Sequence, residues 1–319
     1  MLKVPITTYD TIKLFFRFNN IEQYFNCFNF LESKLEKAKS IQKRENIFPV
    51  LSGYLMGMQI IVTPRGLIAR GSLCKCAIGN NYYSVSIEKI QEAFTDLSKE
   101  LQIPLLKAQV LRIDIGLCIL MQYPTEYYFK SLGTCKGYER WERAHSLYYE
   151  NCNRTIIFYN KRKEVESKRD YKLLEEMGQN VLRCELRFKK DLPRQFNKQN
   201  ITGEDLFNPT FYNSLTNRFK AEYYKIHKIK LLSPIKNNLS CNDGIDYTLS
   251  SLIELHGISN LIGITENLKD KFTRGAFSRY QKKLKSLKFL SKESELITEL
   301  NTKILQIKKN ALFIASNEG

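Results

Sequence analysis

The sequence predicts an α+β fold with a central antiparallel sheet that carries helices on one face and leaves the other face open. Segments that alternate with period two are interleaved irregularly with helical segments, which suits such a sheet. Hydrophobic residues make up 43% of the 319 residues, enough for a core. A stretch rich in Pro, Asn, Ser and Gly at 231–244 marks a boundary between a domain at 1–235 and a small helical domain at 236–319.

The individual elements follow from local patterns. Strands are expected over 10–18, 57–66, 67–79, 110–119, 154–161 and 181–190. Helices are expected over 20–40, 85–102 and 125–133, with a charged helical linker over 162–178. Pro64 to Gly66 are typical of a turn between the second and third strands, and Gly178 ends the linker.

The charge balance points to a polyanionic partner. Lys and Arg number 50 against 33 Asp and Glu, a net charge of +17. Nucleic acid fits this excess better than an anionic membrane surface, because each neutralised phosphate releases counterions. The eight cysteines include no CxxC pair, and no segment has the apolar length of a membrane helix or the pattern of a signal peptide. We expect a soluble, cytoplasmic protein of a bacterial host cell, with reduced thiols and no membrane partner.

Charged and tyrosine side chains gather on the open face if three of the strands share one sheet. Strands 110–119, 154–161 and 181–190 each place their apolar residues on one side. The opposite side then carries Arg112, Asp114, Tyr159, Lys161, Arg183, Glu185 and Arg187. A solvated sheet face with ion pairs would also explain such a set. The combination of acids flanked by Arg on two strands with a Tyr-x-Lys on a third favours a catalytic face.

These residue types suit phosphoryl transfer on DNA. Asp114 and Glu185 can hold a divalent metal, Mg²⁺ or Mn²⁺, because hard cations prefer oxygen ligands. Tyr159 can attack phosphorus and keep a covalent link to the new 5′ end. Lys161 or Arg112 can lower the pKa of the phenol or hold the phosphate oxygens. The chain has only His145, His227 and His256, so a two-histidine metal motif is excluded.

The motifs "LRID", "IIFYNKRKE" and "VLRCELRFKK", in this order, resemble the rolling-circle replication initiators of the phage and plasmid gene II/gene X group. In that family an Arg-Ile-Asp strand precedes the strand of the nicking tyrosine, which has Lys two places on and Glu five places on. The resemblance implies that Arg112, Lys161 and Tyr159 are catalytic and that Asp114, Glu185 and Glu164 bind the metal. Cys184 departs from the family, which often has an aromatic residue there.

The C-terminal region adds a basic helix over 271–290, with apolar residues along one stripe. Short helices precede it, so this domain has the outline of a helix-turn-helix or winged-helix-like fold. A solvated amphipathic helix is the alternative. We expect DNA contacts on both domains, from Arg183, Arg187, Lys189, Arg274, Arg279, Lys282, Lys283 and Lys285.

The sequence therefore favours a metal-dependent, site-specific endonuclease and strand transferase. It would nick an origin through a tyrosine–5′-phosphate intermediate, rejoin it, and so start rolling-circle replication. Its expected partners are origin DNA, duplex and single-stranded, with a host helicase and polymerase. A non-catalytic repressor or copy-control protein is the alternative, and an RNA-binding module is weaker because it lacks paired aromatic strand motifs. The oligomeric state stays open.

Overall fold

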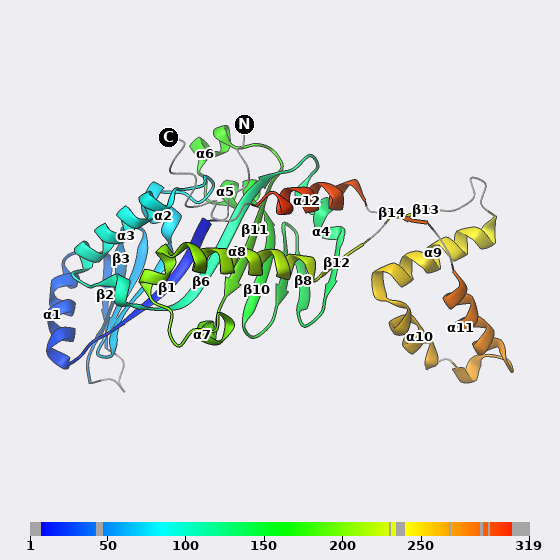
Figure 1. The fold of residues 1–319 in the computed structure, drawn as a ribbon, viewed down its shortest axis with the longest axis horizontal. Helices are drawn as coiled ribbons and strands as arrows, with labels where there is room; N and C mark the ends of the chain where they lie inside the picture. Colours follow the sequence, from blue (N-terminus) through cyan, green and yellow to red (C-terminus); the bar gives the residue numbers. More distant parts are fainter. Residues whose placement is uncertain are drawn as a thin grey trace. The chain divides into compact units, whose positions relative to one another are not determined.

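A computed structural model describes residues 8–42, 47–229, 231–233, 240–267, 269–287, 290–292 and 294–307 (Figure 1). Its strands are β1 (Thr8–Arg17), β2 (Glu36–Ile41), β3 (Val50–Leu55), β4 (Met58–Thr63), β5 (Gly66–Ser72), β6 (Gln109–Leu120), β7 (Leu132–Cys135), β8 (Glu139–Arg143), β9 (Ser146–Glu150), β10 (Arg154–Asn160), β11 (Val181–Phe188), β12 (Ile226–Lys228), β13 (Leu231–Ser233) and β14 (Leu290–Lys292). Its helices are α1 (Ile21–Glu32), α2 (Leu73–Ile78), α3 (Ile87–Leu101), α4 (Thr125–Lys130), α5 (Lys161–Ser167), α6 (Tyr171–Glu176), α7 (Leu192–Gln195), α8 (Pro209–Tyr224), α9 (Cys241–His256), α10 (Ile258–Glu266), α11 (Ala276–Ser286) and α12 (Glu295–Leu305).

A ten-stranded sheet organises the first part of the chain and confirms the α+β class. Its order is β2-β3-β4-β5-β1-β6-β11-β10-β9-β8, and neighbouring strands run antiparallel. The three strands that the sequence singled out, β6, β11 and β10, are adjacent in this order. Side chains that point to one side of each strand therefore lie next to one another across the three strands, which is the condition for a shared site.

Helix α8 covers the apolar face of these central strands (Figure 1). Its buried residues include Tyr212 and Tyr223. The ring of Tyr212 contacts Tyr9 of β1 edge to face, and that of Tyr223 contacts Phe158 of β10. These contacts bury one side of each strand and turn the other side, here called the site face, towards the remaining elements.

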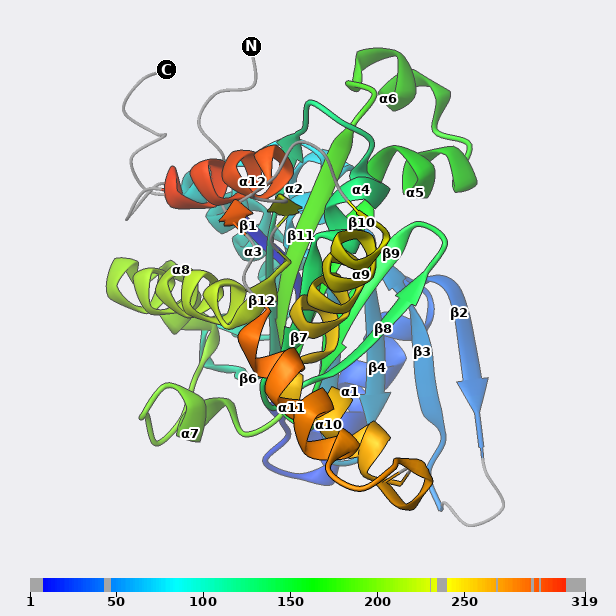
Figure 2. The ribbon, with the colours of Figure 1, turned by 90° about the vertical axis from the view of Figure 1, so that its right-hand side faces the viewer.

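The site face is partly covered, so the expected open face is wrong at one end. Helices α5 and α6 lie side by side (Figure 2), and Val165 and Leu173 from them pack with Val181 of β11 and Tyr82. Cys118 of β6 packs against the same cluster. Charged residues at this end of the face, among them Lys161 and Arg183, are consequently buried instead of solvent-exposed.

Two expected elements differ in the structure. The charged run at the end of the predicted helix 20–40 forms β2, because residues 36–41 pair with β3, and tertiary pairing outweighs helix propensity there. The predicted strand 67–79 ends at Ser72, whose side chain caps α2 by accepting a hydrogen bond from the Lys75 N–H. By contrast, α3 follows its predicted bounds closely, with Ser86 as N-cap.

The chain divides into two compact units. One unit comprises 1–126, 135–225 and 302–319, and the other comprises 127–134 and 226–301. The second unit contains α9, α10 and α11, as the predicted helical region requires, and a two-stranded sheet of β13 and β14. Part of the predicted boundary segment, 234–239, lies outside the described residues. The functional division at 235 stays a prediction.

Candidate active site

Strand register brings the predicted site residues together. Arg187 pairs with Asp114 across β11 and β6, and Arg183 pairs with Tyr159 across β11 and β10. Glu185 lies between the two arginines on β11, opposite Gly116 of β6. Since paired residues in an antiparallel sheet point to the same side, all of these side chains lie on the site face.

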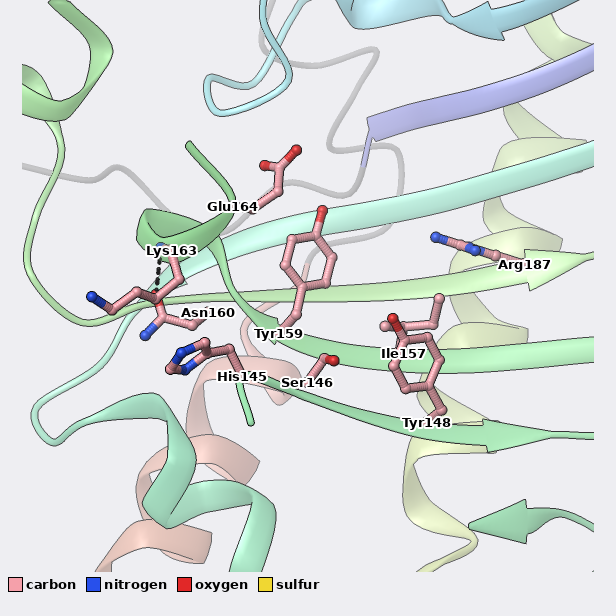
Figure 3. A pocket seen from close by; sticks show the side chains of 9 residues that line it. All are labelled: His145, Ser146, Tyr148, Ile157, Tyr159, Asn160, Lys163, Glu164 and Arg187. Carbon is pink, nitrogen blue, oxygen red and sulfur yellow. Dashed lines mark hydrogen bonds between the residues drawn. The ribbon is translucent and has the colours of Figure 1, made fainter. Parts of the chain in front are cut away.

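Tyr159 lies in a pocket of about 380 Å³ on the site face, at the end of β10. Figure 3 shows its ring amid His145, Tyr148, Glu164 and Arg187, which also line the pocket. The Tyr159 hydroxyl donates a hydrogen bond of 2.8 Å to Glu185 Oε1. Tyr159 and Arg187 therefore line one pocket, and both donate hydrogen bonds to Glu185.

The environment of Tyr159 raises its pKa well above the usual value. Burial is the main cause, and the charge of Glu185 adds to it, while Arg183 opposes both. The main causes of this raised pKa do not include Lys161 or Arg112, and Lys161 Nζ, 6.0 Å from the ring centroid, donates to Asn81 and Glu164. Arg112 Nε donates instead to Asp114 Oδ1 at 2.8 Å. Tyr159 is a neutral phenol in this arrangement.

Arginines bind both carboxylates of the central strands. Arg112 contacts both oxygens of Asp114, and Arg187 Nε lies 3.5 Å from Asp114 Oδ2. Arg187 Nη2 donates to Glu185 Oε2 at 3.1 Å, and Arg183 Nε to Glu185 Oε1 at 3.3 Å. Asp114 is 1% exposed, and burial raises its pKa to about 6 although both arginines act to lower it.

A third carboxylate, Asp10 of β1, was missed by the sequence reasoning. Arg183 Nη2 donates to Asp10 Oδ2 at 2.9 Å, and Asn81 Nδ2 donates to both Asp10 oxygens. Burial acts to raise the pKa of Asp10, but Arg183 and the hydrogen bonds hold it below its usual range. The available signal was a lone acid in the apolar strand "TYDTIKLFF"; Asn81 carried none.

A β-bulge brings Asp10 to the site. The register between β1 and β6 shifts between the pairs Tyr9–Ile115 and Ile12–Ile113. Two residues of β1, Asp10 and Thr11, therefore oppose Asp114 alone. Such bulges redirect side chains and are frequent beside active sites.

Lys161 begins α5 rather than ending the strand, because Asn160 caps the helix by accepting a hydrogen bond from the Lys163 N–H. Its Nζ is buried and donates to Asn81 Oδ1 at 2.7 Å and to Glu164 Oε2 at 2.6 Å. Burial lowers the pKa of Lys161 to about 8. Lys168 pairs with the other oxygen of Glu164.

Gly116 leaves the space that these side chains fill. A Cβ added to it would lie 2.9 Å from Arg183 Nη2, 2.9 Å from Glu185 Cγ and 2.9 Å from the Cys184 carbonyl oxygen. The glycine in "LRIDIGLCI" is thus a requirement of the site, since any larger side chain meets the guanidinium and the carboxylate stem.

Basic side chains contact all three carboxylates that are predicted to bind a metal. Every carboxylate oxygen of Asp114, Glu185 and Glu164 already contacts a cationic side chain. Within the described ranges, no group of three or more His, Cys, Asp or Glu side chains could hold a metal ion. The metal roles of Asp114, Glu185 and Glu164 stay predictions.

The other predicted DNA-binding residues lie in two places. Lys189 follows β11 and pairs with Glu150. The remaining residues lie in α11 or just before it and are exposed, namely Arg274, Arg279, Lys282, Lys283 and Lys285. Leu284 is buried, and the Phe277 and Tyr280 rings contact Phe272, so the expected apolar stripe is present. Lys283 pairs with Asp246 of α9.

Comparison with known families gives one match. Residues 59–215 match the family model for the N-terminal region of a phage replication-associated protein. The matched segment contains Asp114, Tyr159 and Glu185, whereas Asp10 precedes it. The match supports a phage replication initiator. No curated protein matches the chain. No helix among the described residues is long and apolar enough to cross a membrane.

Proposed function

We propose that the chain is a replication initiator of the gene II/gene X type that nicks one DNA strand at an origin and rejoins it through Tyr159. The observation that carries the proposal is the Tyr159 hydroxyl, which donates to Glu185 at 2.8 Å in a pocket that Arg187 also lines. The family match over 59–215 supports the same assignment. Nicking would start rolling-circle replication of a phage or plasmid.

Glu185 is the proposed general base, since its Oε1 is within hydrogen-bond reach of the phenol. The Tyr159 oxygen forms a bond to phosphorus, and the bond between phosphorus and the 3′ oxygen breaks. The phenol proton passes to Glu185 and then through water to the leaving 3′ oxygen, which restores the carboxylate. Because the pKa of Tyr159 is raised, proton transfer accompanies the attack instead of preceding it.

Arg187 is the proposed phosphate ligand. Its side chain is 34% exposed and lines the pocket, while its Nε is buried 3.5 Å from Asp114 Oδ2. A guanidinium donor beside the nucleophile fits a non-bridging phosphate oxygen and stabilises the charge that develops there. Asp114 and Glu185 hold this guanidinium in place from the sheet.

Rejoining reverses the same steps. The phosphotyrosine keeps the energy of the cleaved bond, and a free 3′ hydroxyl can attack it while Glu185 exchanges the proton. The proposal includes duplex origin DNA as a ligand of α11 and single-stranded DNA as a ligand of the site face. It includes a host helicase and polymerase as later partners.

The test uses supercoiled plasmid carrying the origin of the replicon that encodes the chain. Incubation with Mg²⁺ is expected to yield nicked DNA and a protein–DNA adduct on a denaturing gel. Tyr159→Phe is expected to bind DNA and form no adduct. Tyr171→Phe, a matched control at an exposed position in α6, is expected to form it. An adduct with Tyr159→Phe would overturn the assignment.

The divalent metal is tested separately, because the carboxylates proposed to bind it form ion pairs with arginine or lysine side chains in the structure. We propose that nicking requires Mg²⁺ or Mn²⁺ at Asp114 and Glu185, with Glu164 as a further candidate. Full activity in excess EDTA would contradict this part of the proposal and leave the tyrosine reaction standing.

A non-catalytic repressor or copy-control protein is the second candidate, favoured by the exposed cations of α11. Such a protein would bind the duplex origin as tightly and give neither nick nor adduct. The plasmid assay therefore separates the two functions.

A further inference from the structure

A parallel pair of aromatic rings lies on the hairpin of β8 and β9. Trp141 and Tyr148 stack with ring centroids 3.8 Å apart and an interplanar angle of 3°. The guanidinium of Arg143 lies 4.9 Å from the centroid of Trp141 and 5.8 Å from that of Tyr148. Both rings are half-buried, and Arg143 is exposed.

The register places this pair on the site face beside Tyr159. Trp141 pairs with Tyr148, and Tyr148 pairs with Ile157 of β10. Ile157 is two residues before Tyr159 on the same side of its strand. Tyr148 itself lines the pocket that contains Tyr159, as Figure 3 shows.

Trp141 supports Tyr148 from the side away from the pocket. Strand β9 lies between β10 and β8, so Trp141 is one strand further from Tyr159, and it does not line the pocket. One ring face of Tyr148 is covered by Trp141. The rest of the Tyr148 side chain is half-buried beside Ile157 and lines the pocket.

A stabilised hairpin is the simpler explanation for a cross-strand aromatic pair. It accounts for the contact between the rings but not for their position at the reactive pocket. Aromatic pairs favour offset or edge-to-face packing with centroids about 4.5–7 Å apart, whereas these two rings are stacked with centroids 3.8 Å apart. Parallel rings below a cation, on a positively charged chain, match the stacking surfaces that hold single-stranded nucleic acid.

We propose that Tyr148, backed by Trp141, stacks against one unpaired base of the DNA strand whose phosphate lies at Tyr159. The inference rests on the proposed function and names how that site selects its substrate. A base in a duplex is already stacked between its neighbours, so the platform favours a melted strand. Arg143 adds charge for the neighbouring backbone.

The test measures single-strand binding without cleavage. The protein carries Tyr159→Phe, and the ligand is a labelled single-stranded origin oligonucleotide in EDTA. Trp141 is the only tryptophan, so its emission reports on the pair directly. Binding is expected to quench this emission. Tyr148→Leu is expected to weaken binding by roughly 5- to 100-fold, the loss of one stacked base, and Tyr148→Phe to restore most of it.

Two controls separate stacking from hairpin stability. Tyr54→Leu removes an exposed strand tyrosine, from β3, and should leave binding unchanged. The second control is a series of oligonucleotides, each lacking the base at one position. At one of these positions, removal of the base should weaken binding and reduce the fluorescence quenching as much as Tyr148→Leu does. At that position, the losses of binding free energy caused by Tyr148→Leu and by the missing base should not be additive.

Equal binding by Tyr148→Leu and Tyr148→Phe would overturn the inference, as would full additivity at every abasic position. Neither result would touch the proposed function if the wild-type protein still forms the adduct on plasmid. Failure of wild-type protein to form any adduct would instead remove the proposed function and the inference with it.

Discussion

Replacing Gly116 by alanine is expected to damage the site more than the fold. The new methyl would lie 2.9 Å from Arg183 Nη2, from Glu185 Cγ and from the Cys184 carbonyl oxygen. One of these neighbours is backbone of the adjacent strand, so the guanidinium and the carboxylate stem must move. Overpacking of this kind costs about 1–3 kcal/mol. Alanine also lowers the conformational entropy of the unfolded chain, which stabilises the folded state by roughly 0.4–1 kcal/mol.

The net effect is a destabilisation of at most about 2.6 kcal/mol, which is measured as a lower urea midpoint. The effect on chemistry is expected to be larger, because Glu185 accepts the proton of Tyr159. A displacement near 1 Å at a reacting group costs on the order of 10²-fold in rate. The assay is the initial rate of adduct formation on single-stranded origin oligonucleotide, with the urea midpoint measured on the same preparation.

Gly53→Ala in β3 is the matched control. Its new Cβ would lie 2.7 Å from Leu35 Cβ and 3.0 Å from the Glu36 carbonyl oxygen, so the fold is strained without disturbing the site face. We expect Gly53→Ala to lower the urea midpoint and leave the rate unchanged. A Gly116→Ala protein that reacts at the wild-type rate would refute the reasoning.

The remaining predictions concern charges. Asp10→Asn should destabilise the fold by about 1.5–3 kcal/mol, because the buried Arg183 loses the charge of Asp10 and keeps Glu185 as a carboxylate partner; an unchanged urea midpoint would contradict this. The folded-state pKa of Lys161, about 8, lies below its usual value, so the unfolded chain binds more protons and stability should rise between about pH 8 and 10. Lys161→Met should lose that rise in urea titrations. Replacing cations of α11 by glutamine should reduce the salt slope of duplex binding by about one unit each and spare single-strand cutting. The variants are Arg279→Gln, Lys282→Gln and Lys285→Gln in the full chain, since residues 302–319 belong to the first unit.

The sequence predicted which residues share the site face because β6, β10 and β11 each have one apolar side. Alternation alone then places Asp114, Tyr159 and Glu185 together once the strands are neighbours. Lys161 did not follow the alternation, because Asn160 caps a helix at that point. Strand periodicity carries no information on where a cap ends the strand.

Burial of the site could not be predicted from the strands. Arg183 is 1% exposed because residues remote in the chain cover it, and its Nη1 donates to the carbonyl oxygen of Asn81. Asp10 reaches the same guanidinium through a bulge in β1, which depends on how β1 pairs with β6. Both features arise from tertiary contacts that no local pattern of the sequence reports.

The two outermost strands of the large sheet, β2 and β8, have a consequence for behaviour at high concentration. Among the described strands they leave one backbone edge each without a partner, and such edges recruit strands from other molecules. Every residue of β2 is exposed, with Glu36, Lys37 and Lys39 among them, and β8 alternates Glu and Arg around its aromatic ring. A second chain that paired along β2 would bring Lys37 and Lys39 close to their like-charged counterparts, and one that paired along β8 would desolvate its charged side chains. We therefore expect the protein to stay free of edge-to-edge aggregates, and neutralising β2 alone to promote them.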